Sequence, residues 1–151
     1  MDKPIYTTET TPDGLRYFFE SSNGEKIIQK AVIYLETEGA PDIHQLVFGD
    51  LQLDGSVDFL SVSDNKDMKN VLSTVVKTLA LFFEKYPNKG VFFTGSTLSR
   101  TRLYRATISK FIETSELYYQ VYGLLEEENH LEIFEKNHTY KAYLIQKKDE
   151  N

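Results

Sequence analysis

A broad apolar stripe at helical spacing constrains the fold of this chain more than any other sequence feature. Its members recur every three or four residues: Met68, Val71, Leu72, Val75, Val76, Leu79, Phe82, Phe83 and Tyr86. Asp64 or Asn65 can cap the start of such a helix, and Pro87 and Gly90 end it. Because so wide an apolar face must be covered, the stripe predicts a long helix lying across a sheet.

The residues before this stripe have the two-residue period of strands. Asn23-Gly24 is a strong hairpin signal, since both residues tolerate the positive φ of a tight turn. Four or five antiparallel strands are therefore expected, from the segments 5–9, 15–20, 26–36, 43–53 and 57–62.

The residues after the stripe predict one strand, a second helix and three more strands. The strand is expected over 91–94, the helix from 97 to about 115, and the last strands over 117–125, 131–134 and 140–146. Together these segments predict an α+β fold, with a largely antiparallel sheet of seven or eight strands and two helices packed on one face. The expected order is ββββ(β)αβαβββ.

The chain has 151 residues, which predicts a single domain over 1–151 with a core large enough to need no covalent support. It has no cysteine, and its three histidines have no ligand-like spacing, so no disulfide, metal or cofactor is expected. The sequence has no signal-like segment and no apolar run long enough for a membrane span. A cytoplasmic location without membrane attachment is therefore expected.

Charge is distributed in blocks along the chain. The formal net charge is −6, which makes nucleic acid an unlikely partner. Residues 36–67 hold eight acids and one base, giving −7, whereas residues 69–112 hold eight bases and one acid, giving +7. The chain is thus acidic with a basic middle.

The segment VFFTGSTLSRTRLYR, residues 91–105, is the strongest candidate site. A buried strand followed by Gly95, Ser96 and Thr97 at a helix start points main-chain N–H groups outward, which suits an anion. Three arginines follow that start: Arg100, Arg102 and Arg105. They oppose the helix dipole, so something negative is expected nearby. It is either a bound phosphate or carboxylate, held by guanidinium forks, or the aspartates of residues 50–67.

The acidic block contains a second candidate, the aspartates Asp50, Asp54, Asp58, Asp64 and Asp67. Clustered carboxylates can bind a divalent cation or act as acid and base. They are also ordinary turn and cap residues, as in Asp54-Gly55 and Asp64-Asn65. Asp58 differs from the others, because it lies in an apolar run with no turn residue beside it.

The segments GDLQLDGSVD, SDNKDMKNVLSTV and GSTLSRTRLYR resemble a family of small uncharacterised bacterial proteins, classed as a domain of unknown function. The resemblance covers nearly the whole chain. It implies a fold-sized unit without an assigned activity, ligand or catalytic residue. It also implies that the GST turn and the arginines belong to the family's pattern.

These observations favour a non-catalytic binding or regulatory domain, whose partner is a small anionic molecule or an acidic protein segment. Its expected ligand-binding residues are Ser96, Thr97, Arg100, Arg102 and Arg105, with Asp50, Asp58 and Asp64 as possible acidic partners. One alternative is an enzyme for a phosphorylated substrate, with the arginines as clamp and Asp50 and Asp58 as acid–base groups or metal ligands. Another is a single-stranded nucleic-acid binder of whirly-like architecture, an analogy of fold alone.

Overall fold

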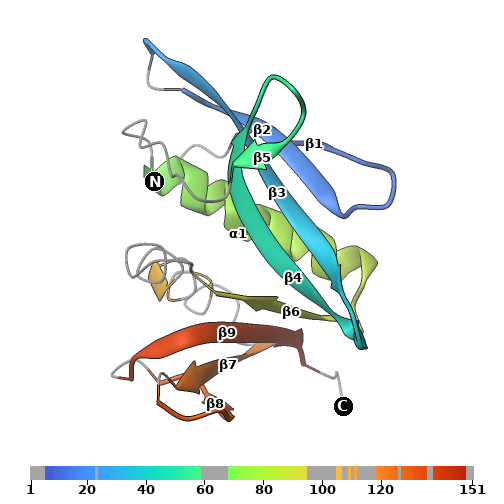
Figure 1. Cartoon of the computed structure of the whole chain (residues 1–151), viewed down its shortest axis with the longest axis vertical. Helices are drawn as coiled ribbons and strands as arrows, with labels where there is room; N and C mark the ends of the chain where they lie inside the picture. Colours follow the sequence, from blue (N-terminus) through green and yellow to red (C-terminus); the bar gives the residue numbers. More distant parts are fainter. Residues whose placement is uncertain are drawn as a thin grey trace. The chain divides into compact units, whose positions relative to one another are not determined.

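The computed structural model describes residues 6–22, 24–58, 68–94, 105–106, 109, 111, 118–125, 127–135 and 138–148. Nine strands and one helix are assigned among them (Figure 1). In chain order they are β1 (Glu9–Thr10), β2 (Arg16–Ser22), β3 (Ile27–Thr37), β4 (Ala40–Leu51), β5 (Val57–Asp58), α1 (Met68–Lys85), β6 (Gly90–Phe93), β7 (Tyr119–Leu125), β8 (Leu131–Ile133) and β9 (Tyr140–Lys147).

The strands pair into one mostly antiparallel sheet in the order β1-β2-β3-β4-β6-β9-β7-β8, and β5 pairs with β4. The chain divides into two compact units, which β4 links by contributing residues to both. The first unit comprises Met1–Leu35 and Leu46–Lys85, and the second comprises Glu36–Gln45 and Tyr86–Asn151.

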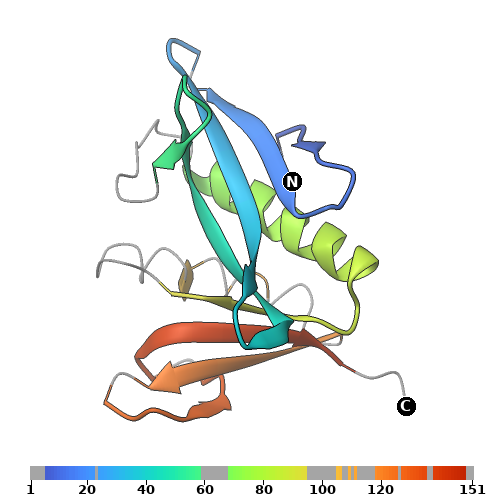
Figure 2. The ribbon, with the colours of Figure 1, turned by 45° about the vertical axis from the view of Figure 1, so that its right-hand side comes forward.

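In the first unit, α1 packs along β2 and β3 (Figure 2). Tyr34 of β3 stacks on Phe82 with ring centroids 4.5 Å apart, and its hydroxyl lies 2.8 Å from the Thr78 hydroxyl. Several members of the apolar stripe are almost fully buried: Val71, Val75, Leu79, Phe82 and Phe83. The expected helix packed on a sheet is therefore confirmed. The predicted caps Asp64 and Asn65 lie outside the described residues.

The predicted hairpin around Asn23-Gly24 is also confirmed. Residues of β2 and β3 pair antiparallel from Arg16↔Ile33 to Ser22↔Ile27. Gly24 adopts a φ of 92°, which a side chain would strain. The position of the glycine turn in the sequence therefore fixes which residues of β2 and β3 pair.

In the second unit, β6 pairs parallel to the first part of β4 and antiparallel to β9, which in turn pairs with β7. A parallel neighbour needs a crossover connection, which α1 provides between β4 and β6. Phe111 is buried against the ring of Tyr119, with centroids 4.9 Å apart. The Phe111 side chain therefore packs on β7.

Two details of the predicted architecture need correction. The sheet has nine strands rather than seven or eight, because both short segments expected to be extended, 5–9 and 57–62, contribute a two-residue strand, β1 and β5. The described residues contain one complete helix, so the predicted two helices in the order ββββ(β)αβαβββ are not what they show. Most of the expected helix at 97–115 lies outside them, although Arg105, Ala106, Ser109 and Phe111 have helical backbone.

None of the helical segments in the described part of the chain is long and apolar enough to cross a membrane.

Candidate functional site

The structure describes three of the predicted site residues: Arg105, Asp50 and Asp58. The remaining ones, Ser96, Thr97, Arg100, Arg102 and Asp64, lie outside the described residues. The predicted ion pair between an arginine of this set and an aspartate of residues 50–67 therefore stays a prediction.

Asp50 makes a buried ion pair with a lysine of the neighbouring strand. The Lys30 Nζ lies 2.5 Å from the Asp50 Oδ1, and the two side chains are only 3% and 9% exposed. Asp58 of β5 is the cross-strand partner of Asp50 and is half-buried. The two aspartates are thus neighbours, as the enzyme alternative requires. However, Asp50 is already neutralised by Lys30, and this weighs against its use as an acid–base group.

Tyr143 of β9 carries a buried hydroxyl at the end of β6. The Tyr143 ring stacks on Phe93, the last residue of β6, with ring centroids 5.5 Å apart. Tyr143 is 1% exposed. The hydroxyl has no hydrogen-bond partner among the residues that the structure describes. Burying a polar group unsatisfied costs about 1–3 kcal/mol. This hydroxyl is therefore the polar atom of β9 that most needs an explanation.

The charge of Arg105 acts on the same hydroxyl. Burial raises the pKa of Tyr143, and the positive charge of Arg105 partly offsets that increase. The guanidinium is thus within electrostatic range of the Tyr143 hydroxyl. Phe93, the cross-strand partner of Tyr143, is followed in the sequence by Thr94 and then by residues 95–97, which lie outside the described residues.

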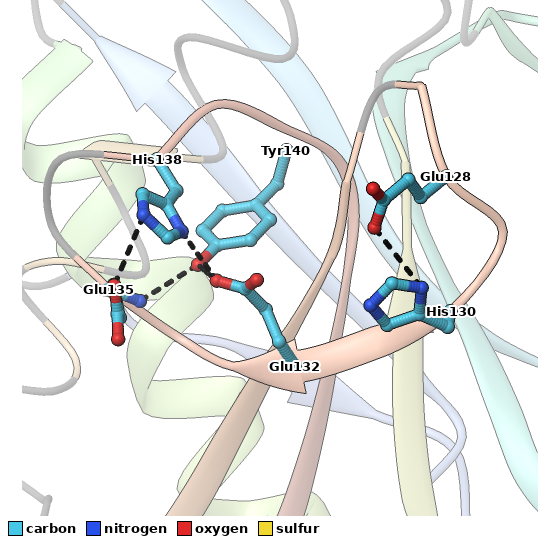
Figure 3. Close-up of polar contacts among 6 residues, drawn as sticks. All are labelled: Glu128, His130, Glu132, Glu135, His138 and Tyr140. Atoms are coloured by element: carbon cyan, nitrogen blue, oxygen red, sulfur yellow. Dashed lines mark hydrogen bonds and ion pairs between the residues drawn. The ribbon is translucent and has the colours of Figure 1, made fainter.

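A second polar cluster, which the sequence analysis does not predict, lies between β8 and β9 (Figure 3). The Glu132 Oε2 accepts a hydrogen bond of 2.7 Å from the Tyr140 hydroxyl and lies 2.6 Å from the His138 Nδ1. The Glu135 Oε2 lies 3.1 Å from the other ring nitrogen of His138. The imidazole therefore lies between two carboxylates.

The ionisation of this cluster follows from its hydrogen bonds. Bonds from Tyr140 and then His138 lower the pKa of Glu132. The bond to Glu132 raises the pKa of His138, and the charges of both glutamates act in the same direction. Burial, followed by the bond to Glu132, raises the pKa of Tyr140 to about 12. The arrangement favours an ionised Glu132 beside a protonated His138.

Comparison with known proteins places the chain in a family. Residues 2–148 match the model of a family described as "Family of unknown function (DUF6934)". The chain belongs to this family. Membership of DUF6934 confirms the resemblance to a domain of unknown function over nearly the whole chain. No curated protein and no solved structure matches the sequence.

In this DUF6934 chain, Gly123 explains how Tyr140 reaches the glutamates. A Cβ on Gly123 would lie 2.2 Å from the Tyr140 Cδ1, so the ring fits across β7 only because position 123 has no side chain. A register shift at Leu124/Leu125 accompanies this packing. A glycine inside an aromatic strand is a sequence signal for such close approach. A second signal is the spacing Glu132-x₂-Glu135-x₂-His138, which places three donor side chains close together in the sequence.

Proposed function

We propose that this domain is a non-catalytic binding or regulatory module that holds an anionic group at the end of β6. The group is a phosphate or carboxylate, carried by a small molecule or by an acidic protein segment. The observation that supports it is the buried Tyr143 hydroxyl, which has no partner within the described residues and lies in the field of Arg105.

The chemistry of these two groups matches an anion and not a cation. A tyrosine hydroxyl donates one hydrogen bond, and a guanidinium donates several in a planar fork that fits carboxylate or phosphate oxygens. Tyr143 is buried and Arg105 is half-buried, and charge-assisted hydrogen bonds are stronger where water is partly excluded. An anionic oxygen that accepts from Tyr143 would remove the cost of its unsatisfied hydroxyl.

The predicted strand–turn–helix would supply the remaining contacts. In this proposal, main-chain N–H groups of the second helix, expected from 97 to about 115, face the anion. Further donors are Ser96, Thr97, Arg100 and Arg102. The domain would act in the cytoplasm, where phosphorylated small molecules are available.

The enzyme alternative has weaker support. Its carboxylates, Asp50 and Asp58, are adjacent, but Asp50 is committed to Lys30 in the core of the first unit. A catalytic carboxylate must be able to exchange protons with substrate or water, and a buried ion pair restricts this exchange. The binding module is therefore the better-supported function.

A thermal-shift experiment tests the proposal. Inorganic phosphate, pyrophosphate, nucleoside monophosphates and citrate are added to the full chain in the absence of metal. A ligand at about 100 times its Kd stabilises the folded state by about 2.7 kcal/mol. Replacing Arg105 with alanine should remove about 1.5–3 kcal/mol of this stabilisation, the usual contribution of a hydrogen bond to a charged group.

The matched control is Lys89→Ala. Lys89 directly precedes β6, at the strand's opposite end, where its Nζ pairs with Asp42 at 3.3 Å. This variant loses the same charge and should keep the full anion response. A response that needs a divalent metal would support the enzyme, and salt-sensitive binding of oligonucleotides would support the nucleic-acid alternative. The proposal is wrong if no anion shifts the wild type, or if Arg105→Ala responds like the wild type.

A further inference from the structure

Glu132, Glu135 and His138 bring together the donor types of a transition-metal site. Each offers one ligand atom, and the three atoms lie within 4.8 Å of one another. Carboxylate oxygen and imidazole nitrogen together suit zinc and its neighbours in the first transition series. A metal–ligand bond to such atoms is about 2.0–2.2 Å long, so the side chains, of which Glu135 is 64% and Glu132 25% exposed, would have to move closer to surround one ion.

We propose that this cluster binds one divalent transition-metal ion of the zinc type. The site is independent of the anion site, because it uses neither Tyr143 nor Arg105. In the metal-free protein, the His138 ring lies between the Glu132 and Glu135 carboxylates, at 2.6 Å and 3.1 Å from their Oε2 atoms. In the bound protein, the ion would lie among these same donor atoms.

Tyr140 makes this cluster more than three neighbouring surface residues. It is 1% exposed, and its hydroxyl donates to the Glu132 carboxylate while it accepts from the main-chain N–H of Glu135. One buried hydroxyl thus positions two of the three ligand residues. Outer hydrogen bonds of this kind orient metal ligands, and their loss typically lowers metal affinity by about 10–100-fold.

The position of Tyr140 is itself fixed. Its ring lies over Gly123, where any Cβ would overlap with it, and contacts Phe134 with centroids 5.5 Å apart. Tyr140 therefore connects the two glutamates, through its hydrogen bonds, to the packed core of the sheet. Preorganisation of this kind lowers the entropic cost of collecting three ligands.

The turn before β8 holds a natural control. His130 Nδ1 lies 3.3 Å from Glu128 Oε2, and both side chains are more than half exposed (Figure 3). This histidine meets one carboxylate and has no buried tyrosine among its described contacts. It shares the residue type with His138 but is more exposed, at 64% against 43%, and within the described residues it has one carboxylate in ion-pair distance rather than two. The proposal therefore assigns the ion to His138 and not to His130.

Titration calorimetry with zinc chloride on the tag-free full chain tests the proposal. One ion per chain is expected for the wild type. His138→Gln and Glu135→Gln should each reduce the affinity at least tenfold. Tyr140→Phe, which keeps the ring and removes the hydroxyl, should weaken binding by about 10–100-fold. His130→Gln should bind zinc like the wild type.

Cobalt(II) provides a second readout that does not depend on heats. Its visible absorption should appear with one equivalent of wild type or His130→Gln, and should be absent with His138→Gln. Circular dichroism verifies that each variant is folded. The proposal is overturned if the folded wild type binds neither ion, if His138→Gln binds as tightly as the wild type, or if His130→Gln removes the binding.

Discussion

The Lys30–Asp50 pair and the Glu132–Glu135–His138 cluster hold opposite charges together in physically different settings. The lysine and aspartate side chains are 3% and 9% exposed, whereas His138 and Glu135 are 43% and 64% exposed. A buried pair cannot exchange its partner for water or an ion without large cost. An exposed cluster can exchange its partner, and its contribution to stability is small. The difference indicates that the first pair serves the fold and that the cluster is available for a ligand.

Asp50→Ala provides the largest test of this comparison. It removes the carboxylate that faces a buried ammonium, and breaking such a pair typically costs about 3–5 kcal/mol. Urea denaturation measures the loss. The control is Asp42→Ala, which removes an 85% exposed carboxylate from Lys89 and should cost less than about 1 kcal/mol.

A double variant sharpens this test. Lys30→Met combined with Asp50→Leu replaces both charges with apolar groups of similar size, and it should recover most of the stability lost in Asp50→Ala. If the double variant is as unstable as the single one, the pair is not an isolated electrostatic unit. If Asp50→Ala costs no more than Asp42→Ala, the contrast between buried and exposed pairs is wrong.

Gly123→Ala should have an intermediate effect. The new Cβ would lie within 2.5 Å of three atoms of the Tyr140 ring, so the ring must move. Overpacking of this kind costs about 1–3 kcal/mol. Differential scanning calorimetry measures the change. The control is Gly39→Ala. A Cβ at position 39 meets nothing within 4 Å, but the backbone φ of 79° is unfavourable for alanine. This variant therefore reports the effect of backbone strain without a steric clash.

His138→Gln should have the smallest effect on stability. It removes a 43% exposed ring from two carboxylates, and such exposed ion pairs contribute little to stability. Its free energy of unfolding in metal-free urea titrations should therefore stay close to that of the wild type. A loss as large as that of Asp50→Ala would show that the cluster is a structural element, contrary to the comparison.

The sequence was sufficient for the parts of the fold that local chemistry decides. Asn23-Gly24 identified a hairpin, and the apolar stripe from Val71 to Phe83 identified a helix on a sheet. Both signals lie within a few neighbouring residues, where turn geometry and helical period act directly. The parallel pairing of β4 with β6 depends on a crossover, which no local pattern specifies.

Contacts between side chains of different strands were harder to predict, because they depend on how the strands are aligned in the sheet. Lys30 and Asp50 are twenty residues apart in sequence, and only the alignment of β3 and β4 brings them together. His138 and the two glutamates converge because Gly123 admits the Tyr140 ring. The anion site was predicted from its turn and arginines, but the Tyr143 hydroxyl that supports it comes from β9, about fifty residues further along the chain.

The most direct test of the binding function is a comparison of wild type and Tyr143→Phe, with and without the anion that stabilises the wild type most. Without anion, the variant should be more stable by about 1–3 kcal/mol, because an unsatisfied buried hydroxyl has been removed. With anion, it should lose most of the stabilisation that the wild type gains. Denaturant titrations of both proteins measure the four free energies. The account is contradicted if Tyr143→Phe is less stable without anion and gains as much from the anion as the wild type.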